Sequence, residues 1–281
     1  MKDDRIFPFT RFIGAIVALV LGLAFVILFF FPNQTGELFA WAITPQMSSR
    51  YFGAAYLGGA WIQANVAFDK RWHRVQVGFP VVTVFTIFMF IATILHWERF
   101  SLGTLPFNAW LMTYIISPFL IPAIWFYNKR TDSGQPEESD VVVSPTARLI
   151  TRLIGIMVLV FVAMGFLYPD FFIRIWSWKL TALTARVMAG WLSSIGVGAL
   201  LLASDSRWSA WRVLLEAIFI GHSLVLVAAG INPSDFTTSV FNWFTLSVAV
   251  GLLVIAVYYV IMERRRRKTG KGYKAEAKTT S

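Results

Sequence analysis

The chain has 281 residues, of which 57% are hydrophobic and only 14% are charged, and its mean hydropathy is +0.64. This composition excludes an ordinary soluble domain of that length. The absence of cysteine excludes disulfide bonds and thiolate chemistry.

The apolar residues gather in eight blocks of about 20 residues, which is the length that an α-helix needs to cross a hydrocarbon core of roughly 30 Å. The sequence therefore predicts an all-α integral membrane protein with eight transmembrane helices. The blocks run over 12–31, 51–68, 75–95, 108–127, 149–168, 184–203, 210–230 and 242–262.

Landmarks of the first four blocks return in the last four, about 137 residues later. Pro32 and Trp41 correspond to Pro169 and Trp178, with the same spacing in both halves. The other pairs are Thr44 with Thr181, Arg50 with Arg186, and Asp69-Lys70-Arg71-Trp72 with Asp205-Ser206-Arg207-Trp208. This pattern predicts a tandem duplication of a four-helix unit. Because each unit has an even number of helices, both units cross the membrane in the same direction and are parallel.

The basic residues predict the orientation. If the N-terminus is cytoplasmic, all but five of the 25 Lys and Arg residues lie on the cytoplasmic side, as the positive-inside rule requires. We therefore expect both termini in the cytoplasm. The five exceptions are Arg50, Arg99, Arg174, Lys179 and Arg186.

The expected organisation has four regions: a first four-helix repeat (1–127), a linker (128–147), a second repeat (148–262) and a tail (263–281). The linker holds Gly, Pro, Ser and four acidic residues and is predicted to be a flexible cytoplasmic hinge. The tail is basic and poor in apolar residues, so it is predicted to be disordered. A stop-transfer signal is its simplest role, and adhesion to anionic lipid headgroups is the alternative. Nucleic-acid binding is not expected, because no aromatic or folded element accompanies the charge.

The repeated arginines, Arg50 and Arg186, are the first candidates for ligand binding. Each precedes an Asp by nineteen residues, or about 28 Å of helix, so it lies at the outer membrane boundary. A guanidinium there could bind a carboxylate, a phosphate or a lipid headgroup. The alternative is that each arginine ties a loop to carbonyl groups or extends to water. Outer residues that could complete a site are Thr44, Thr181, His96, Asn108 and Asn242.

Two further features of the repeat have structural interpretations. In the Asp-x-Arg-Trp turns, Asp and Arg are expected to pair locally while Trp anchors at the headgroup level. Small residues recur on the second and sixth helices, including Gly58 and Gly190. They allow close backbone approach, so we expect these two helices to be the most closely packed, near the interface of the repeats.

The seventh helix carries polar residues that break the repeat. Arg212 and Glu216 share a face, whereas His222 lies about 120° around from Glu216. An intramembrane Glu suggests proton or cation handling, and an ion pair with Arg212 is the structural alternative. His222 is interpreted as a hydrogen-bonded core residue, since three scattered His residues form no ligand pattern and no metal or cofactor is predicted. No catalytic motif is found, so no catalytic residue is predicted.

Several stretches resemble uncharacterised bacterial membrane proteins built from four-helix units, broadly the DoxX-like proteins. The stretches are Trp41-Ala42-Ile43-Thr44-Pro45, Arg50 to Gly59, and Ala92 to Phe100. The second repeat has Asn232-Pro233 where the first has His96-Trp97. The resemblance implies a four-helix unit in a bacterial plasma membrane and no particular activity.

Three functions follow as hypotheses. The leading one is binding or transport of a small anionic or lipid-like ligand at an outward-facing groove between the repeats. The second is an accessory subunit that packs against a partner chain in a larger membrane complex. The third is an intramembrane enzyme centred on Glu216 and His222.

Overall fold

The computed structural model describes residues 2–279, with side chains described as far as residue 270. Apart from two isolated β-bridges, every regular element in this range is helical. Eight long helices match the eight apolar blocks one for one: α1 (Pro8–Phe30), α3 (Gln46–Phe68), α4 (Gly78–Leu95), α5 (Leu105–Lys129), α6 (Pro145–Leu167), α8 (Ala182–Ser204), α9 (Trp208–Ile231) and α10 (Thr238–Thr279). Two short helices, α2 (Thr35–Leu38) and α7 (Pro169–Ile175), lie in the connections after α1 and α6.

Seven of the long helices are long and apolar enough to cross a membrane, which makes this a multi-pass membrane protein. The helix outside that set is α3, which carries Arg50, Gln63 and Asn65. It packs between α1 and α9, and 13 of its 23 residues are buried. A helix enclosed by protein can hold polar side chains that a lipid-facing helix cannot, because neighbouring helices supply their hydrogen-bond partners.

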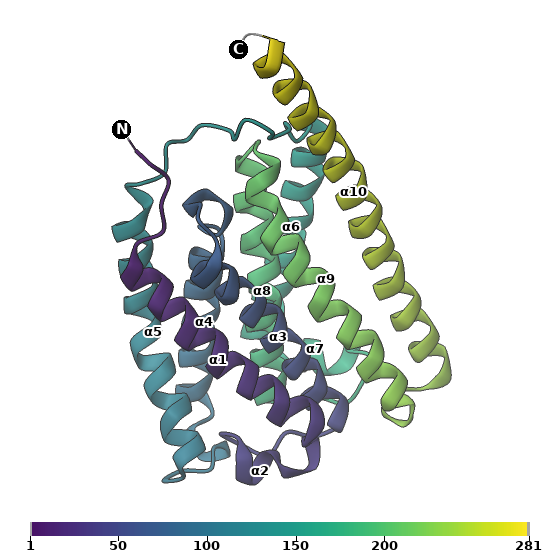
Figure 1. Cartoon of the computed structure of the whole chain (residues 1–281). Coiled ribbons are helices and arrows are strands. Elements are labelled where there is room, and N and C mark those ends of the chain that lie inside the picture. The colour runs from purple at the N-terminus through teal and green to yellow at the C-terminus, as the bar shows by residue number, and fades with distance from the viewer. Residues whose placement is uncertain (1, 280–281) are drawn as a thin grey trace.

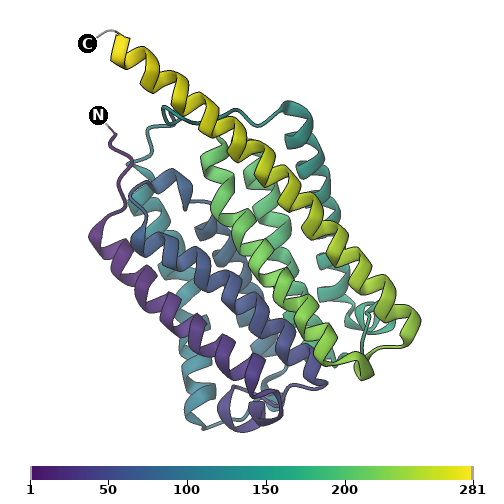
Figure 2. The same cartoon turned by 45° about the vertical axis from the view of Figure 1, so that its right-hand side comes forward.

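The helices form two layers of four. In one layer α1, α3, α9 and α10 lie side by side, and Figure 2 shows them as purple, blue, green and yellow helices in front. In the other layer the order is α6, α8, α4 and α5. Each layer therefore joins two helices of one half of the chain to two of the other half. Figure 1 shows the linker and both ends of the described chain at the same end of the bundle, called here the linker end.

Glycines lie where helices of the two halves cross. A Cβ atom built on Gly58 of α3 would come within 2.9 Å of the carbonyl oxygen of Ala217 in α9, and one on Gly190 of α8 would come within 2.2 Å of Met89 in α4. The small-residue faces of α3 and α8 therefore do lie at the interface between the halves. However, they pack against α9 and α4 and make little contact with each other.

The linker makes contacts that a flexible hinge would not make. Linker residues 128–147 are held down rather than free: Glu137 pairs with Arg74, Asp132 pairs with Arg207, and Val143 is fully buried. The linker is held in place because its acidic side chains pair with arginines from both halves of the protein. Beyond residue 262, α10 continues through Thr279. Within α10, Glu263 pairs with Arg212 of α9 and with Arg266.

Candidate functional site

Arg50 and Arg186 each reach across to the other half of the chain, at the end of the bundle opposite the linker. The Arg50 guanidinium donates to the side-chain oxygen of Asn232, which follows α9. The Arg186 guanidinium donates to Nε2 of His96, which follows α4, at 2.7 Å. Asn232 and His96 occupy corresponding places in the two halves, so the two contacts are equivalent.

The other partners of these arginines are also uncharged. Arg50 donates to Oε1 of Gln46 at 2.8 Å, and Arg186 donates to the Phe166 carbonyl at 3.0 Å. Burial and the neighbouring Arg186 and Arg99 lower the pKa of His96, so its ring is neutral and its Nε2 can accept. Neither arginine forms an ion pair within the part of the chain whose side chains are described. Asp235 acts on the charge of Arg50, and Asp170 on that of Arg186, only through space, so uncharged partners hold each guanidinium in place.

The remaining outer candidates are not brought into these contacts. Thr181 caps α8, where its hydroxyl accepts from the Thr184 amide at 3.1 Å. Thr44, Asn108 and Asn242 are exposed. Of the seven outer residues predicted to bind a ligand, the structure thus joins Arg186 to His96 and places Arg50 at the equivalent position.

Glu216 belongs to a polar group between α3, α9 and α10. Its carboxylate accepts from Nε1 of Trp61 at 3.1 Å and from the Tyr259 hydroxyl. Arg212 lies 3.8 Å from it and also pairs with Glu263 at 2.9 Å. These contacts give Glu216 a structural role, and none of them involves His222.

His222 instead lines a cavity of about 400 Å³ inside the bundle. The walls come from both halves of the chain, through α1, α3, α4, α5, α8 and α9. Exposed lining residues on α1 and α5, Ile16, Met112 and Ile116, mark its mouth on the outer surface of the bundle. The mouth is bordered by apolar side chains, so a membrane around these helices would present lipid chains to it.

The cavity is mostly apolar and has no Asp, Glu, Lys or Arg among its lining residues. Its polar groups are hydroxyls, one imidazole and one indole N–H. They belong to Tyr51, Thr86, Thr113, Tyr114, Ser117, Trp191, Ser194 and His222. Along α3 the wall extends from Tyr51 to Ile62, or roughly 16 Å at 1.5 Å per residue. Such a chamber suits a molecule with a long apolar part and small uncharged polar groups.

A buried polar cluster at the linker end was not predicted from the sequence. Here His73, in the turn between α3 and α4, contacts Asp4 through Nδ1 and the Ser209 hydroxyl through Nε2 at 2.9 Å. Ser209 in turn donates to Asp140 of the linker, and Glu137 lies 3.1 Å from Nε2 of His73. The cluster therefore joins the N-terminal segment, the linker and both halves.

The contacts of the His73 ring resemble a Ser-His-Asp triad, but its charge state differs. Burial lowers the pKa of His73, and hydrogen bonds to Asp4 and Glu137 outweigh burial and raise the pKa to about 9. The imidazolium donates from both nitrogens, and the Ser209 proton points to Asp140. Because a charged ring cannot accept the serine proton, the cluster is a structural junction and not a nucleophilic site.

The sequence did contain a signal for this junction. The repeated Asp-x-Arg-Trp turn is followed in both halves by a polar residue, His73 or Ser209. Local pairing inside the turn occurs in the second half, where Arg207 bonds Asp205 at 2.7 Å. In the first half Asp69 pairs with Arg74 instead, at 3.2 Å.

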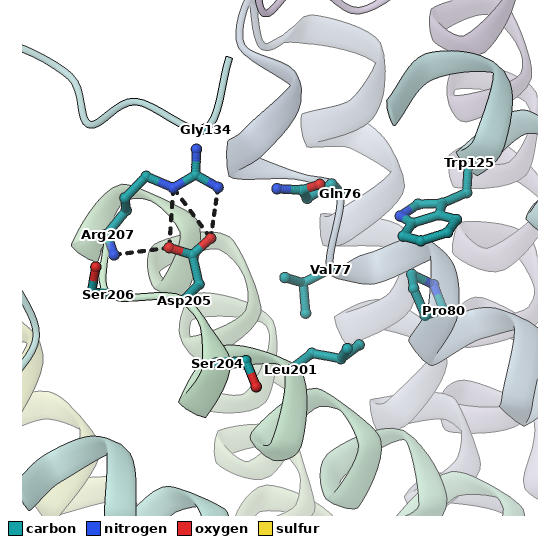
Figure 3. A pocket seen from close by; sticks show the side chains of 10 residues that line it. All are labelled: Gln76, Val77, Pro80, Trp125, Gly134, Leu201, Ser204, Asp205, Ser206 and Arg207. Atoms are coloured by element: carbon teal, nitrogen blue, oxygen red, sulfur yellow. Dashed lines mark hydrogen bonds and ion pairs between the residues drawn. The ribbon is translucent and has the colours of Figure 1, made fainter. Parts of the chain in front are cut away.

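A second cavity of about 400 Å³ opens beside this turn. Figure 3 shows Arg207 and Asp205 on one side of it and Trp125 on the other. Arg207 is already paired with Asp205 and Asp132, so its charge is neutralised. Among the described residues, no group of three His, Asp or Glu side chains has the arrangement of a metal site.

Comparison with known proteins adds no constraint. No family model, curated protein or solved structure matches the chain. The resemblance to DoxX-like proteins therefore stays a prediction.

Proposed function

We propose that this protein resides in a bacterial plasma membrane and binds a lipid-like molecule in the cavity between the two halves. The observation that carries the proposal is the chamber of about 400 Å³ with apolar walls and a mouth between α1 and α5. An apolar cavity of 150 Å³ in another protein stays dry and takes up benzene, so a larger one accommodates a longer hydrophobic molecule.

The proposal includes the topology that the sequence predicts. All eight long helices, α3 included, cross the membrane as two parallel four-helix repeats with both termini cytoplasmic. Two features support the duplication: α1 packs on α3 as α6 packs on α8, and α3 packs on α9 as α8 packs on α4. The equivalent contacts of Arg50 and Arg186 support it further.

Photolabelling tests the binding site. Full-length protein in phospholipid nanodiscs is irradiated with a fatty chain that carries a diazirine, and the labelled peptides are identified by mass spectrometry. We expect labels on α3, α5 and α9 residues of the cavity. Ala55→Phe fills the cavity from α3 and should remove most of this label, as should Ser117→Phe from α5. Ser247→Leu on the exposed surface of α10 is the control. Equal labelling in wild type and both filled variants would reject the site.

A second candidate function is capture of an anionic headgroup by Arg50 and Arg186. It is favoured by the two guanidinium charges that only uncharged groups contact. Native mass spectrometry of gently extracted protein should show a bound anionic lipid that is lost in an Arg50→Gln, Arg186→Gln variant. The same lipid on the variant would reject this role.

A further inference from the structure

The proton position on His222 can be derived from its contacts. Its Nδ1 lies 2.9 Å from the carbonyl oxygen of Ile218, one turn earlier in α9. A carbonyl oxygen can only accept, so Nδ1 must carry a hydrogen. In a neutral imidazole the other nitrogen, Nε2, is then an acceptor.

His222 is neutral because the cavity provides nothing to balance a charge. No acidic or basic residue is among the lining residues, and an unpaired charge in apolar surroundings is very costly. Within the residues whose side chains are described, nothing donates to Nε2 of His222. The cavity therefore contains a hydrogen-bond acceptor that lacks a donor.

Tyr51 contributes a hydroxyl to the same cavity from the facing helix α3. The backbones of α3 and α9 are nearest where Gly221 faces Ala54, and a Cβ atom built on Gly221 would lie 3.3 Å from the Ala54 carbonyl oxygen. His222 follows Gly221, and Tyr51 precedes Ala54 by less than one turn. The Tyr51 side chain lines the cavity, and its hydroxyl bonds no group in the described part of the chain.

We infer that the cavity selects an uncharged amphiphile with a hydroxyl group, such as a long-chain alcohol. The ligand hydroxyl donates to Nε2 of His222. A phosphate is disfavoured, because it would bring an unpaired charge into the cavity, and a carboxylate is disfavoured, because it must first take up a proton. This inference rests on the proposed function and names the chemical class of its ligand.

The test compares three diazirine probes that share one chain: hexadecanol, its methyl ether and hexadecanoic acid. Each is titrated as a mole fraction of the lipid in nanodiscs that hold the full-length protein, and labelling of cavity peptides is measured. One hydrogen bond to a buried acceptor corresponds to an affinity difference of about fivefold to tenfold. We expect the alcohol to half-saturate at a mole fraction lower by that factor than the ether, and the acid to bind more weakly than the alcohol.

Two variants assign the preference to the histidine. His222→Leu should bind alcohol and ether equally, whereas His222→Gln keeps a carbonyl acceptor and should retain part of the preference. Circular dichroism and gel filtration establish that both variants fold. Equal labelling by alcohol and ether in wild type, a preference that survives in His222→Leu, or stronger binding of the acid would overturn the inference while leaving the cavity as a lipid site. If no probe labels the cavity, the proposed function itself fails.

Discussion

His73 lies where the N-terminal segment, the linker and the start of α9 meet, and its side chain is only 1% exposed. It donates to partners that lie far apart along the chain, including Asp4 and Ser209. Because such a charge is buried among fixed acceptors, removing either the proton or the ring leaves those acceptors without a donor.

The raised pKa of His73 predicts a pH-dependent stability. The free ring has a pKa of 6.5 and the folded one about 9, so its contribution is fully present below pH 6.5 and is lost as the pH rises through 9. That contribution is on the order of 3 kcal/mol. We expect the melting temperature of wild type to fall between pH 7 and 10, and that of His73→Gln to start lower and fall less. If the melting temperatures of the two proteins fell by the same amount over this pH range, the assignment would be contradicted.

Among the elements, the linker departs most from the sequence-based interpretation. Its composition is that of a flexible hinge, yet its acidic residues contact arginines 63 and 75 positions away. Composition alone cannot reveal such pairs, since they depend on the turns that the packed helices bring to the linker end. The helices themselves were predictable from the sequence, because apolar blocks of membrane length determine them independently of their partners.

Glu137 provides a test of the linker. Its carboxylate accepts two hydrogen bonds from Arg74, at 2.6 and 2.7 Å. Glu137→Gln should cost about 1–3 kcal/mol and speed proteolysis within residues 128–147. Glu138→Gln is the matched control, because Glu138 is adjacent and exposed. Equal proteolysis rates for the two variants would show that the linker is not held by this pair.

Glu137 should also act on the acidic side of the pH range. Burial raises its pKa, but hydrogen bonds from His73 and Arg74 outweigh burial and hold the pKa well below its usual 4.5. Its contribution is therefore present above pH 4.5 and is lost on further acidification. As the pH falls below 4.5, the melting temperature of wild type should decrease more steeply than that of Glu137→Gln. An equal decrease in the two proteins would contradict this prediction.

For the whole molecule, the two layers explain which parts of the candidate site were predictable. The arginines could be found because they are repeated, and His222 could be found because it lies in an apolar helix. Their partners could not, since each layer combines helices from both halves, and Asn232 and His96 each lie in the half opposite to the arginine that they contact. The cavity was likewise hidden, because six helices contribute to its walls.

The eight-span topology can be tested directly, since the chain has no cysteine. In Glu37→Cys and Lys70→Cys variants the new thiols flank α3, and both positions are exposed. An impermeant maleimide added to intact cells should modify the first and reach the second only after the membrane is opened. Modification of both from outside would show that α3 does not span.

The position of the cavity mouth determines how binding must be measured. Because its rim consists of exposed apolar side chains of α1 and α5, a ligand of the proposed kind would arrive from the bilayer and not from water. The concentration that governs occupancy is then the ligand's mole fraction in the membrane, and dilution into buffer leaves it nearly unchanged. Dilution with additional lipid, in contrast, should empty the cavity.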